Sequence, residues 1–182
     1  NNLGTVMINQ GNYKEAIKLF LAATEINPNF SQAYYNLGTV YKQQKQFELA
    51  IQSYKNAIKS NPIFYQALNN LGVLFKELGD YISSVEYLKK AIDCKPKYID
   101  AMNNLGISLK LMGKIEDAES NFKRVIKIDP NNKEALNNIA IIKYEQGENQ
   151  EAINDYERVI QSQPNFPEAY NNLGSCLIEI GS

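Results

Sequence analysis

One six-residue pattern returns every 34 residues along the 182-residue chain, with no insertion or deletion between its copies. Residues 67–72, Ala-Leu-Asn-Asn-Leu-Gly, show it most regularly, and its other copies begin at Ala33, Ala101, Ala135 and Ala169. A fixed period of this length is typical of proteins built from stacked structural repeats, in which each repeat contacts only its neighbours. The sequence therefore predicts one array with partial repeats at 1–30 and 167–182 and full repeats at 31–64, 65–98, 99–132 and 133–166.

Small residues recur at two positions of the repeat. The first is the last residue of the pattern, occupied by Gly4, Gly38, Gly72, Gly106, Ala140 and Gly174. The second follows twelve residues later and is occupied by Ala16, Ala50, Ser84, Ala118 and Ala152. Glycine within a helical pattern costs about 0.5–1 kcal/mol relative to alanine, so a close approach of two helices must offset that cost. We expect the two small positions to face each other.

Large apolar residues lie at helical spacing around the small ones and predict two amphipathic helices per repeat. The first helices are expected at 32–43, 66–78, 100–111, 134–146 and 168–180, and the second helices at 13–26, 47–59, 81–93, 115–128 and 150–162. Between the two helices, a glycine suited to a left-handed C-cap recurs, with Lys45 as the exception: Gly11, Gly79, Gly113, Gly147 and Gly181. Prolines mark the joints between repeats: Pro28, Pro62, Pro96, Pro130 and Pro164. The fold class is all-α.

Charge and composition exclude several classes of function. The formal net charge is −1 and no cluster of Lys or Arg follows one face, so nucleic acid is not an expected partner. No apolar run approaches the roughly 20 residues of a membrane span, so we expect no membrane contact. The chain has no histidine and no phosphate-binding glycine loop, so we expect no metal, no cofactor and no catalysis in this segment. Two widely separated cysteines, Cys94 and Cys176, favour a cytoplasmic or nuclear protein.

One asparagine position is not explained by packing. This position immediately precedes the Leu-Gly pair, which is Ile-Ala in one repeat, and is occupied by Asn2, Asn36, Asn70, Asn104, Asn138 and Asn172. Four of these follow another asparagine: Asn69, Asn103, Asn137 and Asn171. Asparagine is a poor helix-interior residue, so its recurrence asks for a reason. A primary amide can pair with both the C=O and the N–H of an extended peptide without reading its side chains. The alternative is that each asparagine bonds to the neighbouring repeat and fixes the pitch of the array.

The conserved spacing of these residue types resembles the tetratricopeptide repeat. One full set is Tyr34, Leu37, Gly38, Tyr41, Ala50, Tyr54, Ala57 and Pro62, and the match extends over the whole chain. Departures from the pattern are Ser84, Glu119, Val125, Ala140, Lys143 and Val159. The resemblance implies a right-handed superhelix whose concave surface, formed by the first helices, binds peptides. The expected peptide-binding residues are Asn36, Asn69, Asn70, Asn103, Asn104, Asn137, Asn138, Asn171 and Asn172.

The asparagine series also resembles the repeat domains of nucleocytoplasmic protein O-glycosyltransferases. It rests on Asn36, Asn70, Asn104, Asn138 and Asn172, and it implies that the groove holds an extended segment of a protein substrate. A substrate-recognition domain of such an enzyme is therefore one alternative to a stand-alone interaction scaffold. A structural subunit of a large assembly, with contacts or oligomerisation through the ends of the array, is another. Because residues 1 and 182 fall inside repeats, we expect the natural chain to continue.

Lysines near the ends of the first helices form a further series. They are Lys42, Lys76 and Lys110, and Glu77, Glu145 and Glu179 lie beside them. We expect these charges to solvate the rim of the groove, and a weak contact with an acidic partner is the alternative. The groove positions lack the arginines and lysines of a carboxylate-binding clamp, so a C-terminal carboxylate is not the expected ligand.

Overall fold

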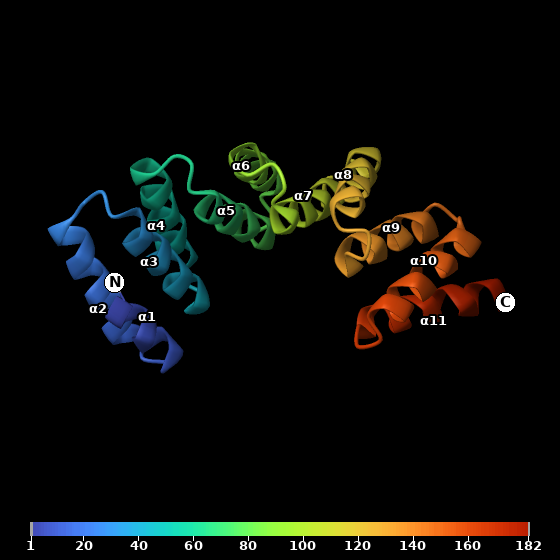
Figure 1. Ribbon diagram of the computed structural model, residues 1–182, viewed down its shortest axis with the longest axis horizontal. Coiled ribbons are helices and arrows are strands. Elements are labelled where there is room, and N and C mark those ends of the chain that lie inside the picture. Colours follow the sequence, from blue (N-terminus) through green and yellow to red (C-terminus); the bar gives the residue numbers. More distant parts are fainter. Residues whose placement is uncertain (1, 182) are drawn as a thin grey trace. The chain divides into compact units, whose positions relative to one another are not determined.

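The computed structural model describes residues 2–181, except for the side chains of Asn2 and Asn9. This part of the chain contains eleven α-helices and no strand, so the all-α prediction is confirmed (Figure 1). The helices are α1 (Asn2–Asn9), α2 (Tyr13–Ile26), α3 (Ser31–Gln43), α4 (Phe47–Ser60), α5 (Tyr65–Glu77), α6 (Tyr81–Cys94), α7 (Ile99–Leu111), α8 (Ile115–Ile128), α9 (Lys133–Glu145), α10 (Asn149–Ser162) and α11 (Pro167–Gly181). Every predicted helix end lies within one residue of its position in the structure.

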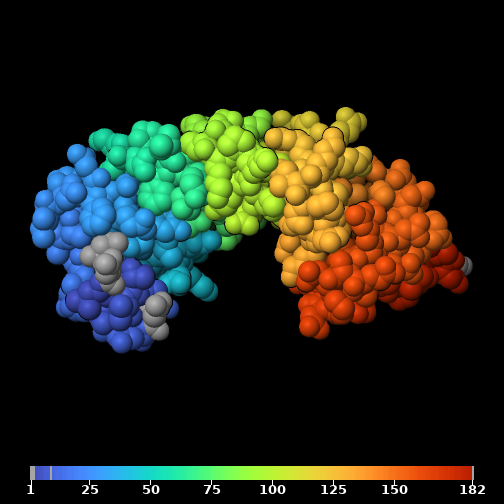
Figure 2. All heavy atoms as spheres, viewed as in Figure 1, coloured from blue at the N-terminus to red at the C-terminus, as the bar shows by residue number. Residues whose placement is uncertain are grey.

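The helices belong to two compact units, Asn1–Tyr98 and Ile99–Ser182, and the division falls at a repeat boundary. Within each unit, every helix packs against the next one along the chain. In the second unit, α9 also contacts α7 and α11, so the first helices of three successive repeats adjoin one another. Figure 2 shows side chains filling the spaces between the neighbouring ribbons of this unit, in yellow to red. No helix in the described residues has the length and apolar character to cross a membrane.

In four repeats the glycine accommodates a large side chain from the second helix of the same repeat. A methyl group added at Gly106 would lie 2.5 Å from the Phe122 ring, and the same relation joins Gly4 with Phe20, Gly38 with Tyr54 and Gly72 with Leu88. The two small positions also lie close together, as expected: the Ser84 carbonyl oxygen would lie 3.2 Å from a methyl group added at Gly72, and Ala140 and Ala152 share one buried cluster. The large side chain completes this contact, because two small residues alone would leave a void, whereas a large side chain packed on the glycine fills the interior to native density.

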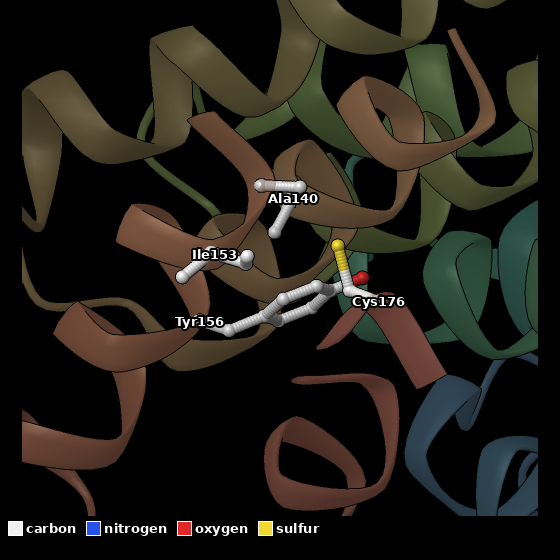
Figure 3. Packing of buried hydrophobic residues seen from close by; sticks show 5 residues of the cluster. Ala140, Ile153, Tyr156 and Cys176 are labelled. Atoms are coloured by element: carbon white, nitrogen blue, oxygen red, sulfur yellow. The ribbon is translucent and has the colours of Figure 1, made fainter. Parts of the chain in front are cut away.

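The repeat with alanine at this position packs in a related way. Ala140 of α9 is fully buried and belongs to one cluster with Ile153 and Tyr156 of α10 and Cys176 of α11 (Figure 3). Burial raises the pKa of both the Tyr156 hydroxyl and the Cys176 thiol. The interpretation of Cys176 as a buried apolar residue is confirmed, and its thiol is not oxidised to a disulfide.

The turns between paired helices follow the predicted left-handed geometry. Gly11, Gly79, Gly113 and Gly147 have φ values of 73°, 82°, 75° and 81°, and Lys45 adopts the same conformation at φ 59°. At Gly113 the closing hydrogen bonds run from its own N–H to the Lys110 carbonyl and from the Lys114 N–H to the Leu109 carbonyl. This pattern is the Schellman arrangement that satisfies carbonyls at a helix end. Gly181 is instead the last residue of α11.

Candidate functional site

The two asparagines of each pair have different environments. The second asparagines, Asn36, Asn70, Asn104, Asn138 and Asn172, are half-buried. The first asparagines, Asn69, Asn103 and Asn137, are only 6%, 9% and 7% exposed, whereas Asn171 is exposed. One residue along a helix is a rotation of about 100°, which turns the first asparagine toward the helix of the neighbouring repeat. The Asn2 side chain lies outside the described part of the chain.

Several of these amides form hydrogen bonds between repeats. Asn172 Nδ2 of α11 donates to Asn137 Oδ1 of α9 at 3.2 Å. In the first unit, Asn70 Nδ2 of α5 donates to the Tyr35 hydroxyl of α3 at 3.1 Å. Tyr35 occupies the repeat position at which the later repeats have their first asparagine. These bonds link successive first helices, as the alternative interpretation of the asparagine series requires, and they leave the second asparagines half exposed on the same face.

Two adjoining hollows lie on this face of the second unit. One, of about 390 Å³, lies between α7 and α9, and the other, of about 400 Å³, lies between α9 and α11. Asn137 lines both. Five other predicted asparagines line one or the other: Asn103, Asn104, Asn138, Asn171 and Asn172. The structure thus brings six of the nine predicted binding residues together at one surface.

The amide groups at this surface differ in how they are held. Asn104 Nδ2 donates to the Asp100 carbonyl one turn earlier at 2.9 Å, and Asn138 Nδ2 donates to the Glu134 carbonyl at 2.8 Å. Each of these bonds stays within its own helix and fixes the side chain against the helix surface. The second asparagines of α7 and α9 are therefore held in similar, repeated orientations, one per repeat.

Asn103 is held by the loop of the next helix pair. Its Nδ2 donates to Asn132 Oδ1 at 3.0 Å, and that oxygen also accepts from the Ala135 N–H at 3.1 Å. The Asn132 Nδ2 is directed elsewhere, to Asp129 Oδ2 at 3.1 Å. Because Asn132 offers an oxygen, Asn103 must present its NH₂ group to it, and this fixes the orientation of the amide. The remaining Asn103 Oδ1 is buried and has no hydrogen-bond donor among the described residues.

The charged rim forms bonds between repeats as well. Lys42 Nζ lies 2.8 Å from Glu77 Oε1, and Lys110 Nζ lies 2.8 Å from Glu145 Oε1. Tyr144 replaces the lysine in the next repeat, and its hydrogen bond with Glu179 raises the pKa of the tyrosine hydroxyl. In the first unit, burial lowers the pKa of Lys76. Lys42 and Lys110 are thus engaged with carboxylates of the following repeat, which reduces their availability to an acidic partner.

Models of one protein family match the sequence from residue 4 to residue 181. Those described as "Tetratricopeptide repeat" match residues 31–64, 65–98, 99–132 and 121–154, and one described as "TPR repeat" matches residues 4–45 and 142–181. This chain is a tetratricopeptide repeat protein. The TPR family consists of protein-interaction scaffolds, and this TPR chain is accordingly a scaffold for contacts with other proteins.

Solved structures share the fold of this TPR protein. MamA superposes with a TM-score of 0.82 at 22% identity, covering 88% of this chain and 94% of that one. YrrB, described as a TPR protein with an unusual peptide-binding site, gives 0.78 at 20% identity, with 93% and 88% covered. The pilF protein of Pseudomonas aeruginosa gives 0.81 at 21% identity, with 98% and 87% covered. A comparison with curated proteins gives no significant match.

The sequence interpretation missed part of this TPR surface. Asp100, Glu134 and Glu168 also line the two hollows, each from the second residue of its first helix. Their recurrence every 34 residues was the signal that could have revealed them. The loop residue Asn132 was also missed, because its contact with Asn103 joins residues 29 positions apart and has no local signature.

Proposed function

We propose that the second unit binds an extended segment of a partner protein across α7, α9 and α11. The observation that carries this proposal is the pair of adjoining hollows lined by six asparagines of the predicted series, from three successive repeats. First helices pack about 8–10 Å apart, and an extended strand rises about 3.3 Å per residue, so one asparagine pair meets every third residue of the ligand. Such a series suits a regular, extended backbone.

The expected chemistry is pairing of side-chain amides with peptide groups. Asn138 uses one amide hydrogen within its own helix, and a primary amide carries a second hydrogen and two acceptor sites. Each new bond to a ligand contributes about 0.5–1.5 kcal/mol net. The free energy gained from a few such bonds is only slightly larger than the free-energy cost of ordering a peptide. Binding is therefore weak and tolerant of sequence, with dissociation constants on the order of 10 μM to 1 mM.

The inter-repeat bonds support a division of roles among the asparagines. Asn137 is buried and accepts from Asn172, so its main contribution is to hold α9 against α11. The half-buried Asn104 and Asn138 are better placed to meet a ligand. Asn137 and Asn172 thus hold α9 against α11, and the proposal assigns the contacts with the peptide mainly to Asn104 and Asn138.

Replacing Asn104 and Asn138 together by alanine tests the proposal. Random dodecapeptides are first selected on the immobilised wild-type protein, and the enriched peptides are titrated against purified variants by fluorescence anisotropy. We expect N104A/N138A to bind about tenfold more weakly, which corresponds to the loss of about two hydrogen bonds. Asn154→Ala is the matched control, since Asn154 is an exposed asparagine of the second helix α10. Unchanged affinity of a folded N104A/N138A protein would refute the proposal, as would a selection that enriches no peptide.

A further inference from the structure

The hollow between α7 and α9 is lined by acids and by no base. Asp100 and Glu134 lie on its wall, and Glu168 lines the adjoining hollow. No lysine or arginine of the described residues lines either one. In the first unit the equivalent position holds neutral residues, Gln32 and Gln66. The negative charge is therefore a property of the second unit and not of the repeat as such.

The hollow also contains a hydrogen-bond acceptor that lacks a donor among the described residues. Asn103 lines it, is nine-tenths buried, and has an Oδ1 to which no group in the described part of the chain donates. The orientation of that amide is not free, because Asn132 accepts from its NH₂ group and is itself held by Asp129. Leaving a buried acceptor without a donor costs free energy, about 1–3 kcal/mol in mutational series. The oxygen can be satisfied only by a group that brings hydrogens.

Beside the acids and the asparagines, part of the wall of the hollow is apolar. Ile99, Ile107 and Phe166 lie on it beside the two carboxylates. A long cationic side chain combines a hydrocarbon stem, which apolar walls cover, with a head that carries three to five hydrogen-bond donors. The apolar residues of the hollow suit the hydrocarbon stem of such a side chain, and the carboxylates and amides suit its cationic head.

Lys133, a lysine beside the hollow, does not fill that role. Lys133 Nζ lies 3.9 Å from Glu134 Oε1 and 5.0 Å from the centre of the Phe166 ring, but Lys133 does not line the hollow. Both members of the pair are more than a third exposed. An ion pair of this length between exposed groups is worth little, so another cation can replace it at Glu134.

We propose that the extended segment bound by the second unit places a lysine or arginine side chain in the hollow between α7 and α9. This inference rests on the proposed function above. The cationic head lies against the carboxylates of Asp100 and Glu134, and one of its N–H groups donates to Asn103 Oδ1. The asparagines hold the backbone of the ligand, and the acids select the charge at one of its positions.

Two labelled dodecapeptides provide the test. Both have the sequence of one peptide enriched by the wild-type protein, except at a single position, where one has arginine and the other glutamine. The comparison is repeated with this position moved along the sequence. Anisotropy titrations use the wild-type protein, D100N/E134Q, and the control E151Q/E157Q, which removes the same charge from exposed positions of α10. We expect arginine to improve wild-type affinity by about threefold to tenfold at one position, in line with two exposed charge pairs.

The outcomes separate the two proposals. If D100N/E134Q abolishes the preference for arginine and E151Q/E157Q retains it, the inference is supported. If no position prefers arginine, or if the preference survives D100N/E134Q, the cation inference is overturned. In that case N104A/N138A still decides whether the groove binds peptide backbones. If neither peptide binds the wild-type protein, the proposed function fails and the inference fails with it. Circular dichroism shows whether each variant is folded.

Discussion

Replacing Gly106 by alanine adds one methyl group where α7 packs against the Phe122 ring of α8. The added carbon would lie 2.5 Å from two atoms of the Phe122 ring, whereas carbon atoms in contact are normally about 3.5–4.0 Å apart. The ring or the helix must therefore move by about 1 Å. Phe122 is fully buried, so the ring has no solvent-filled space to enter.

Two opposing terms set the magnitude. Forcing an extra methyl group into a packed core costs about 1–3 kcal/mol. Alanine in a helix interior gains about 0.8–1 kcal/mol over glycine. The packing term is larger, so we expect G106A to lower the free energy of unfolding by about 1 kcal/mol. Gly174 occupies the same repeat position in α11, but an added methyl group there would meet nothing within 4 Å. G174A should therefore raise the free energy of unfolding by about 0.5–1 kcal/mol.

Urea unfolding followed by circular dichroism measures both variants, and hydrogen exchange of the α7 and α8 amides shows whether the effect of G106A is local. A third protein isolates the clash. In a Phe122→Ala background the ring is gone, so the sign of G106A should reverse and alanine should stabilise the helix. If G106A stabilises the protein that retains Phe122, or if the sign does not reverse when the ring is removed, the assignment of this glycine to ring packing is wrong.

The remaining predictions concern the turns and caps. Lys45 adopts a left-handed backbone at φ 59°, a conformation that costs a non-glycine residue about 1–2 kcal/mol. Glycine removes this cost but makes the unfolded chain more flexible, so K45G should raise the free energy of unfolding by about 0.5–1 kcal/mol. Urea unfolding tests this, and G113K should have the opposite effect. The Asp80 carboxylate caps α6, and its hydrogen bonds to Ser83 lower its pKa. D80A should cost about 1 kcal/mol near neutral pH. Because folding lowers the pKa of the Asp80 carboxyl, the stabilisation by the cap is fully present above the pKa of the unfolded chain and is lost as pH falls through the pKa of the folded protein. The free energies of unfolding of the wild type and D80A should therefore converge in acid. If the difference in free energy of unfolding between the wild type and D80A stayed constant from neutral to acidic pH, the assignment of Asp80 as a charged cap would be wrong.

The positions of the helices could be predicted because their signals are local. The glycine after most first helices and the proline after each second helix fall at fixed distances in the chain, and they indicate the helix ends and the left-handed turns. The partner of Gly106 could not be predicted in this way. Periodicity shows that Gly106 and Phe122 lie on inward faces, but it does not show which residue stands opposite which.

The asparagine site was predictable only as a face of the repeat. A helical wheel places the series on one side of the first helices, and six of its members do line neighbouring hollows. The wheel contains no neighbouring helix, so it could not show that Asn69, Asn103 and Asn137 are buried. The unpaired oxygen of Asn103 depends on a loop from the next repeat, and such long-range contacts leave no mark in a local pattern. The glycosyltransferase and assembly-subunit alternatives stay predictions.

The packing contact between the glycine and the large side chain lies wholly within one repeat, since Gly106 and Phe122 are only 16 positions apart. A cut at any proline joint therefore divides no such pair. Lengthening or shortening the chain by one whole period adds or removes complete pairs, and the new junction has to re-form only the bonds between repeats, such as that of Asn172 with Asn137. The molecule is modular in the genetic sense as well: duplication of one segment extends the binding face without redesign of its interior.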